Sequence, residues 1–323
     1  MNCTAGSSRQ AKIFRVPCHM DITFVIVNWN TKDLLKDCLD SIYKTVRTVL
    51  FEIIVVDNAS HDDSVLMVRE VFPGVRIIEN SENRGFGAAN NQAFEVMKGR
   101  YALLLNTDTV LTENAVHELF GFMESHDNVA MAGGQLLNRD GSRQNSIANF
   151  PTIFTLLMNT ALLEYLFPAK YPSKRYEHKN PLKVESVIGA CMLVRKKAMD
   201  EVGILDERYF FFFEETDWAY QMGGAGWKIY HIPSAKIYHL QGQSIGRNSR
   251  SRIEFYRSRY KFFNKWKGRF YSVVVSGVIF IRLFINWFLT SVENILTAGM
   301  SKKLRDKWVV YFQLILWHLK GRQ

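Results

Sequence analysis

Residues Ile22–Asn30 read ITFVIVNWN, and this stretch decides the fold class. Its first six residues, Ile22–Val27, are all apolar or β-branched, which is typical of a strand covered on both faces. The following segment, Lys32–Thr45, has apolar residues at helical spacing. A buried strand followed directly by an amphipathic helix predicts the first unit of an α/β fold.

The same alternation continues along the first half of the chain. Further strands are predicted at Phe51–Val56, Val75–Ile78 and Tyr101–Leu105, with helices at Ser64–Phe72, Ala88–Met97 and Glu113–Ser125. Strands that alternate with helices predict an α/β fold whose mostly parallel sheet has helices on both faces. Ligands of such sheets bind beyond the carboxyl ends of the strands. Polar residues follow those ends here: Asn28, Asn30, Asp57, Asn58 and Asp108.

The second half is less regular. A strand is predicted at Val129–Leu137 and another at Val184–Val194, with a polar loop at Tyr171–Lys183 between them. Helices are predicted at Phe154–Phe167 and Lys196–Val202.

Composition narrows the class of protein. The 323 residues are 47% hydrophobic and 13% aromatic, which excludes a disordered chain. A mean hydropathy of -0.10 excludes a polytopic membrane protein. The four cysteines include no CxxC pair, so a disulfide framework is not expected.

The net charge of +10 is unevenly distributed. From Gly246 to Gln323 there are 16 Lys and Arg against three acidic residues, a net charge of +13, while the other 245 residues have 25 basic and 28 acidic ones, a net charge of −3. A basic, aromatic-rich tail suggests an anionic partner. We predict three parts: a disordered or non-native extension at 1–19, an α/β domain at 20–267, and a helical amphipathic tail at 268–323.

The tail has two apolar stretches. Tyr271–Thr290 is long enough for one membrane span, but it contains Arg282, which is costly in lipid. Trp308–Leu319 has only 12 residues, too few to return. Helices lying in the surface of the membrane, with flanking cations, fit better. The alternative is an interface between copies of this chain.

Three polar motifs are candidates for chemistry. Asp57 follows a buried strand and either accepts a hydrogen bond from a pyrimidine base or caps the next turn. Asn106-Thr107-Asp108 also ends a strand, where Asp108 either binds a divalent cation that bridges phosphates or acts as an N-cap-like residue before the helical segment Thr112–Ser125. Gly85–Asn90 resembles a dinucleotide-binding turn, but Asn90 replaces the third glycine and the turn follows the third strand.

Acidic residues follow four consecutive phenylalanines. Glu214, Glu215 and Asp217 come directly after Phe210–Phe213. Apolar surroundings raise the pKa of a carboxyl group towards that of a general base, whereas acids at a helix N-terminus also simply offset the helix dipole. His239 ends a predicted strand and is either structural or a further metal ligand.

Seven motifs in order resemble those of family 2 glycosyltransferases, which are inverting, metal-dependent enzymes with the GT-A fold. They are VIVNWN (Val25–Asn30), VVDNAS (Val55–Ser60), NRGFGAANN (Asn83–Asn91), LLLNTDT (Leu103–Thr109), Gly189–Cys191, EETDW (Glu214–Trp218) and IYH (Ile237–His239). The resemblance covers Asp21 to Lys267. Two further segments, LLNRDGSRQ (Leu136–Gln144) and Gly203–Trp218, look most like the rhamnosyltransferase branch that builds bacterial surface polysaccharides.

The resemblance implies a role for each motif. Asp57 would hold the nucleotide base, Asp108 would bind Mg²⁺ or Mn²⁺ as the last residue of a DxD motif, and Glu215, or its neighbour Glu214, would be the catalytic base. His239 would be a second metal or diphosphate ligand. The nucleotide-sugar site would also include Val27, Asn28, Asn30, Asn83, Gly85, Asn106 and Thr107. Asn106 departs from the DxD pattern, and the base is Glu where the family has Asp. Arg247, Arg250, Arg257 and Arg259 would close over the diphosphate, or form a solvated surface.

The sequence therefore predicts a glycosyltransferase that uses a dTDP- or UDP-sugar, with dTDP-L-rhamnose as the leading donor. Its acceptor would be a saccharide, expected to be lipid-linked, and nucleic acid is not an expected partner. We expect the protein on the cytoplasmic face of the membrane, bound peripherally through its tail, with a homo-oligomer as a further possibility. Two alternatives stay open: an NAD(P)-dependent oxidoreductase and a non-catalytic scaffold with the same fold.

Overall fold

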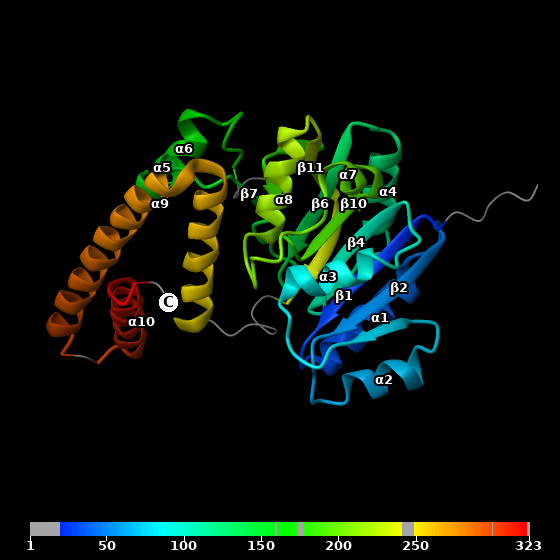
Figure 1. Ribbon diagram of the computed structural model, residues 1–323, viewed down its shortest axis with the longest axis horizontal. Helices are drawn as coiled ribbons and strands as arrows, with labels where there is room; N and C mark the ends of the chain where they lie inside the picture. The colour runs from blue at the N-terminus through cyan, green and yellow to red at the C-terminus, as the bar shows by residue number, and fades with distance from the viewer. Residues whose placement is uncertain (1–19, 159, 174–176, 241–248, 299, 322–323) are drawn as a thin grey trace, which may run out of the picture.

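The computed structural model describes residues 20–158, 160–173, 177–240, 249–298 and 300–321 (Figure 1). The predicted extension at 1–19 and Arg247 lie outside these residues. The strands are β1 (Ile22–Asn28), β2 (Phe51–Asp57), β3 (Arg76–Glu79), β4 (Tyr101–Asn106), β5 (Thr109–Leu111), β6 (Val129–Leu137), β7 (Ile147–Ala148), β8 (Leu182–Val184), β9 (Ser186–Val187), β10 (Cys191–Arg195) and β11 (Lys228–His239). The helices are α1 (Lys32–Thr45), α2 (Ser64–Val71), α3 (Phe86–Phe94), α4 (Ala115–Glu124), α5 (Ile153–Leu157), α6 (Thr160–Leu166), α7 (Lys196–Val202), α8 (Glu214–Gly224), α9 (Ser249–Leu296) and α10 (Lys302–Leu319).

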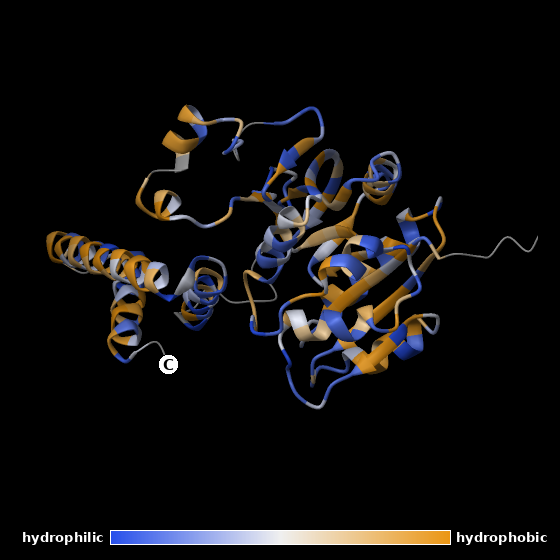
Figure 2. Cartoon of the chain, turned by 45° about the horizontal axis from the view of Figure 1, so that its top comes forward, coloured by the Kyte–Doolittle hydropathy of each residue, from blue (hydrophilic) through white to orange (hydrophobic). Residues whose placement is uncertain are grey.

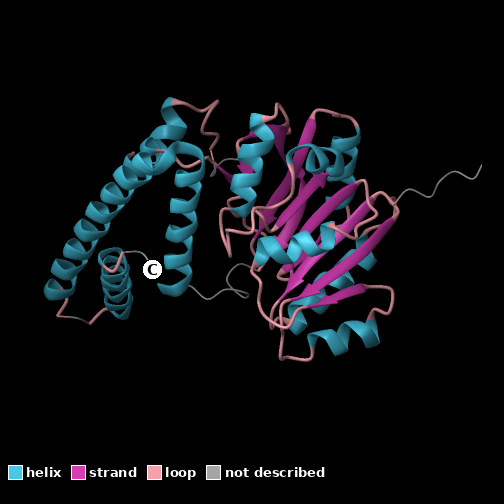
Figure 3. Ribbon diagram, viewed as in Figure 1, coloured by secondary structure: helices cyan, strands magenta, loops and turns pink. Residues whose placement is uncertain are grey.

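A nine-stranded sheet forms the centre of the α/β domain, with the strand order β3-β2-β1-β4-β10-β6-β11-β5 and β8 paired with β11 (Figure 3). The pairs β1–β2, β1–β4, β2–β3 and β6–β11 are parallel. Strand β10 lies antiparallel between β4 and β6. The mostly parallel α/β sheet predicted from the sequence is therefore confirmed, and β10 is inserted at its centre.

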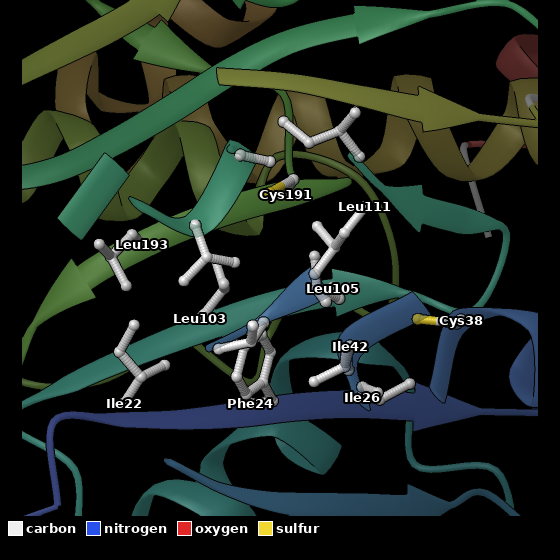
Figure 4. Close-up of a cluster of buried hydrophobic side chains, with 14 of the residues drawn as sticks. Ile22, Phe24, Ile26, Cys38, Ile42, Leu103, Leu105, Leu111, Cys191 and Leu193 are labelled. Carbon is white, nitrogen blue, oxygen red and sulfur yellow. The ribbon is translucent and has the colours of Figure 1, made fainter. Parts of the chain in front are cut away.

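The sheet has an apolar layer on each face. Phe24 and Ile26 of β1 belong to the layer that also contains buried residues of α1, α2 and α4. Val25, between them, belongs to the opposite layer, with residues of α3, α7 and α8. Successive side chains of a strand point to opposite faces, so the unbroken apolar run at Ile22–Val27 supplies both layers. Figure 4 shows side chains of β1, β4 and β10 gathered on the first face.

Two elements of the second half differ from their prediction. The strand predicted at Val184–Val194 is three short ones, because Gly189 and Ala190 form a turn and β9 leaves the main sheet to pair with β7. The helix predicted at Phe154–Phe167 is two, α5 and α6, because the backbone of Met158 is extended. Both predictions were wrong in continuity, since apolar content alone does not reveal where a segment turns.

The C-terminal helices form a separate layer beside the sheet (Figure 1). Helix α9 has one residue with non-helical geometry, Gly268, whose φ of 83° bends the chain. The second part of α9 packs against α10 through Val275, Ile279 and Leu314. Figure 2 shows that the second part of α9 is mostly hydrophobic, whereas its first part and α10 mix hydrophobic and hydrophilic residues. By length and composition, α9 between Arg250 and Leu296 is able to cross a membrane.

Candidate active site

A cavity of about 800 Å³ opens at the carboxyl ends of β1, β2 and β4. One of its walls contains five residues predicted for the site: Val27, Asn83, Gly85, Asn106 and Thr107. Trp29, Thr31, Asn58 and Phe86 extend this wall. The position agrees with the expectation that ligands of a parallel sheet bind beyond the ends of its strands.

Hydrogen bonds fix the amides of this wall. The Asn58 side chain donates to the Asn83 side chain (3.3 Å) and to the Gly85 carbonyl (3.2 Å). The Asn83 oxygen in turn accepts from the backbone N–H of Gly85 (3.0 Å). Gly85 has a φ of 84°, and a Cβ here would lie 2.5 Å from the carbonyl oxygen of Phe210. The turn therefore requires glycine, because both its φ and the close approach of Phe210 exclude a side chain.

Asp57, Asn28 and Asn30 are not among the residues that line the cavity: Asp57 and Asn28 are buried, and Asn30 is exposed. The carboxylate of Asp57 accepts hydrogen bonds from Asn28 Nδ2 (2.8 Å) and from the N–H of Ser60 (2.9 Å). Asn30 accepts from the N–H of His61 (2.7 Å). These bonds join the ends of β1 and β2, which brings the three predicted residues together but gives them bonds within the fold.

The side chains of Asp108 and His239 face each other where β5 pairs with the end of β11. Strand β5 pairs with β11, so that Thr109 lies opposite His239. His239 Nε2 is 3.4 Å from Asp108 Oδ1, and both side chains are almost fully buried. The two residues were predicted from the sequence to belong to one site. The pairing of β5 with β11 brings them together although they are 131 residues apart in the sequence. Within the described ranges, no group of three or more His, Cys, Asp and Glu side chains is arranged to hold a metal.

Glu214 and Glu215 begin helix α8. The two residues before it, Phe212 and Phe213, have positive φ values of 68° and 73°, a conformation that costs free energy in a bulky residue. Ser258 Oγ of α9 donates to the carbonyl of Phe211 (2.9 Å), and the N–H of Phe86 donates to that of Phe210 (2.9 Å). The surrounding structure thus holds this strained turn and fixes where α8 begins.

The two glutamates have different surroundings. Glu214 is buried, and desolvation, followed by the nearby charges of Glu215 and Glu254, raises its pKa well above the usual value. Glu215 is partly exposed and packs over Gly189, where a Cβ would lie 3.7 Å from its Cγ. Desolvation raises the pKa of Glu215 to about 7. Glu215 is therefore the glutamate better suited to exchange a proton near neutral pH.

Gly189 also connects Glu215 with the aspartate turn. The N–H of Asn106 donates to the carbonyl of Ala190 (3.0 Å). The turn that carries Asp108 and the glycine beneath Glu215 therefore belong to neighbouring ends of β4 and β10. This arrangement places the base candidate and the metal-ligand candidate on the same edge of the sheet.

Asp217, the third acid of the cluster, has a structural role. Its carboxylate accepts hydrogen bonds from Tyr209 Oη (3.0 Å) and Trp266 Nε1 (2.6 Å), and it pairs with Lys265 Nζ (2.5 Å). Its side chain is 2% exposed. Asp217 thus attaches α8 to the first part of α9.

Only part of the opposite wall of the cavity was predicted from the sequence. Phe210, Phe211 and Phe212 line it, together with a set of residues from α9: Arg250, Ser251, Glu254, Arg257 and Lys261. Arg250 and Arg257 were predicted to approach the ligand, but Glu254 and Lys261 were not. Arg259 was also predicted to approach the ligand, but it does not line the cavity; it is half-buried, with its guanidinium over the rings of Phe255, Tyr256 and Phe213. Trp29, also missed, stands inside the VIVNWN motif and could have been found there.

The model of the glycosyl transferase family 2 matches residues 23–203, more than half of the chain. The chain belongs to this family. It is therefore a glycosyltransferase, and the resemblance in its motifs is confirmed. The match favours this class over the oxidoreductase alternative.

Two relatives of this glycosyltransferase have names that describe sugar transfer. It is 26% identical over 226 residues to the N-acetylglucosaminyl-diphospho-decaprenol L-rhamnosyltransferase of Mycobacterium tuberculosis, covering 65% of this chain and 73% of the relative. It is also 26% identical to the low-salt glycan biosynthesis hexosyltransferase of Haloferax volcanii, covering 62% of this chain and 61% of that one.

A solved structure supports the fold. The mannosyltransferase of Pyrobaculum calidifontis, in complex with GDP-Man and Mn²⁺, matches with a TM-score of 0.56 over 92% of this chain and 87% of its own. The two sequences are 14% identical, so the match shows a common GT-A fold and no more.

Proposed function

We propose that this glycosyltransferase transfers a sugar from a nucleoside diphosphate to a saccharide acceptor, with inversion at the anomeric carbon and with a divalent cation. The leading donor is dTDP-L-rhamnose, followed by a UDP-sugar. The observation that carries the proposal is the approach of His239 to Asp108, 3.4 Å apart, beside the Asn106–Thr107 end of the cavity. The rhamnosyltransferase relative supports the choice of donor.

The cavity suits a nucleotide sugar in size and chemistry. About 800 Å³ lies within the range of small-molecule sites. Trp29 and Phe210 are 50% and 46% exposed, and such rings stack on bases and sugar faces. The amides of Asn58 and Asn83 would hydrogen-bond to hydroxyl or carbonyl groups, and Arg250 and Arg257 would offset the charge of the diphosphate.

Asp108 and His239 fit a divalent cation. A carboxylate oxygen and an imidazole nitrogen are both ligands for Mn²⁺, while Mg²⁺ prefers the oxygen. Two protein ligands leave positions for the oxygens of the diphosphate. When bound, the cation would neutralise the charge that develops on the leaving diphosphate.

Glu215 would act as the general base. Its pKa of about 7 lets it be deprotonated yet basic near neutral pH. It takes the proton of an acceptor hydroxyl, and that oxygen attacks the anomeric carbon as the bond to the diphosphate breaks. Burial also raises the pKa of Glu214 well above its usual value, but Glu214 is buried whereas Glu215 is partly exposed, so Glu215 is the glutamate that an acceptor would reach.

We further propose that the C-terminal helices place the enzyme on the cytoplasmic face of a membrane, near a lipid-linked acceptor. Large apolar side chains are exposed along the second part of α9, including Ile281, Phe288 and Ile295. Lysines and arginines lie at both ends of this part, in Lys267–Arg269 and Lys302–Lys307. An apolar face flanked by cations is typical of helices that lie on anionic lipid. The synthesis of surface polysaccharide would be the setting.

A panel of nucleotide sugars tests the proposal. The purified full chain is incubated in detergent with dTDP-L-rhamnose, UDP-glucose, UDP-N-acetylglucosamine or GDP-mannose, with Mn²⁺ or with EDTA. Released nucleoside diphosphate is measured. We expect release from a dTDP- or UDP-sugar that EDTA abolishes. Full release in EDTA would remove the metal from the proposal, and no release from any donor would favour a non-catalytic scaffold.

A further inference from the structure

Gln144 has no role in the proposed reaction, although it ends the LLNRDGSRQ segment singled out in the sequence. It follows the turn after β6 and contacts His239 with both ends of its amide. Its Nε2 donates to the carbonyl of His239 (2.5 Å) and to the side-chain oxygen of Asn138 (2.8 Å). Its Oε1 lies 2.9 Å from His239 Nδ1.

These contacts determine which imidazole nitrogen carries the proton. The His239 carbonyl and Asn138 Oδ1 can only accept hydrogen bonds, so the NH₂ group of Gln144 must face them. The oxygen of Gln144 then faces Nδ1 of His239, and an oxygen that only accepts requires an N–H there. In a neutral imidazole, the lone pair is therefore at Nε2, the nitrogen that faces Asp108.

The surroundings of Nε2 suit a cation better than a hydrogen bond. Its 3.4 Å separation from Asp108 Oδ1 exceeds the usual N–H···O distance of about 2.7–3.2 Å. His239 also borders a second cavity, of about 260 Å³, which Asn138, Gln144 and Ile188 line as well.

We propose that Gln144 is a positioning residue that holds His239 as the Nδ1–H tautomer and so presents its Nε2 lone pair to a divalent cation beside Asp108. This inference rests on the proposed metal dependence of the enzyme. Replacing the residue that hydrogen-bonds to a metal-bound histidine commonly weakens metal binding by about 10- to 100-fold.

The test compares variants of the full chain in detergent, with Mn²⁺ alone as the probe. Gln144→Met keeps the length of the side chain and removes its hydrogen bonds. Ser142→Ala is the matched control, because it removes a hydrogen bond to Asn138 in the same turn without touching His239. Binding is followed by the loss of the electron paramagnetic resonance signal of free Mn²⁺. We expect the dissociation constant to rise about 10- to 100-fold in Gln144→Met and to stay within about two-fold in Ser142→Ala.

A second readout requires no metal. Two-bond ¹H–¹⁵N correlation spectra of the metal-free protein report which nitrogen of His239 is protonated, with His239→Gln used to assign the signal. We expect Nδ1–H in the wild type and a mixture of tautomers in Gln144→Met. A purely structural role for Gln144 would lower the melting temperature without changing the tautomer.

The outcomes separate this inference from the proposed function. Unchanged Mn²⁺ affinity in Gln144→Met, or a wild-type His239 protonated at Nε2 or at both nitrogens, overturns the role of Gln144. If Asp108→Asn also leaves Mn²⁺ affinity unchanged, or the wild type binds no Mn²⁺, the proposed metal site itself is wrong and the inference falls with it. Loss of binding in Asp108→Asn but not in Gln144→Met rejects the inference alone.

Discussion

The two parts of helix α9, before and after Gly268, have opposite surroundings. Before Gly268, polar side chains attach the helix to the α/β domain: Lys265 lies between Asp206 (2.8 Å) and Asp217 (2.5 Å), and Trp266 donates to Asp217. After Gly268, the helix exposes a row of large apolar side chains. The row comprises Phe270, Val273, Val274, Ile281, Phe284, Ile285, Phe288, Leu289, Val292, Ile295 and Leu296.

The comparison shows that the two parts of α9, joined at the bend at Gly268, contribute to two different surfaces. The first part supplies Arg250, Glu254 and Arg257 to the wall of the cavity, so it is a component of the active site. The second part packs on α10 with one face and leaves the other exposed. Exposed apolar surface on this scale marks an interaction site, which we propose to be the membrane.

The largest expected effect comes from removing each part in turn. A chain that ends at Lys267 keeps Lys265 and Trp266, so we expect it to stay folded, to leave the membrane fraction and to bind nucleotide. A chain that ends at Leu240 leaves Asp217 buried without those partners, and we expect it to lose cooperative unfolding. Circular dichroism melts and flotation with liposomes measure both. A Lys267-terminated protein that stays with the membrane would contradict the division at Gly268.

Asp217→Asn tests how the first part of α9 is attached to the α/β domain, because it replaces only the buried carboxylate by a neutral amide. Breaking a buried ion pair from one side commonly costs about 3–5 kcal/mol, so we expect a loss of that order in the free energy of unfolding. Asp200→Asn is the matched control, because Asp200 pairs with Lys196 on an exposed surface, where pairs contribute about 1 kcal/mol or less. Urea unfolding measures both. Equal losses would mean that the first part of α9 is not held by Asp217.

Glu215→Gln tests the proposed general base without changing the contacts that hold α9 on the α/β domain. We expect transfer to fall by at least about 10²-fold and nucleotide affinity to change little. Burial raises the pKa of Glu215 to about 7, so wild-type transfer should decline as the pH falls below 7 and the base becomes protonated. The same shift means that the folded state favours the neutral acid. The contribution of the neutral Glu215 carboxyl group to the stability of the folded protein is complete below about pH 4.5 and is lost as the pH rises through 7.

Above pH 7, Glu215→Gln should therefore melt at a higher temperature than the wild type. If Glu214→Gln is the inactive variant and Glu215→Gln transfers normally, the base is Glu214.

The smallest expected effect concerns one exposed side chain. Leu289 on α9 and Leu66 on α2 are both 53% exposed, so each is replaced by Glu. Leu289→Glu should weaken binding to anionic vesicles about ten-fold, since it removes apolar contact and adds charge repulsion, while Leu66→Glu should have no effect. Vesicle sedimentation at several salt concentrations measures this. Equal binding by both variants, or a dimer lost in Leu289→Glu, would favour an interface between copies of the chain.

The first half of the fold could be predicted because its signals are local. Ile22–Val27 and Tyr101–Leu105 are apolar runs bounded by polar residues, and each became a strand within about one residue of its predicted ends. Some of the residues that line the cavity from this half, among them Val27, Asn106 and Thr107, stand at the carboxyl ends of such strands. Parallel strands place their carboxyl ends at one edge, so sequence position sufficed for Asn106 and Thr107.

The rest depends on contacts between distant residues. The bond from the Ser60 N–H to Asp57 matches the turn-cap alternative, but nothing near Asp57 indicated that Asn28 would also use its carboxylate. The approach of Arg250 and Arg257 was expected only from the family resemblance, and nothing local indicated that Glu254 would line the cavity. Arg259 resembles its basic neighbours in the sequence, yet it lies among three aromatic rings. Such differences depend on which face of a long helix packs on the domain. In α9, which has 48 residues and a bend at Gly268, no single periodic pattern of apolar residues predicts that face.

The most direct test of the account compares Asp108→Ala with Glu215→Gln in two assays on the same preparations. Binding of nucleoside diphosphate with Mn²⁺ is measured by calorimetry, and transfer is measured by release of nucleoside diphosphate from the active donor. The account predicts that Asp108→Ala loses Mn²⁺-dependent binding and transfer together, whereas Glu215→Gln keeps binding and loses transfer. Full transfer by Asp108→Ala in the presence of EDTA would contradict it.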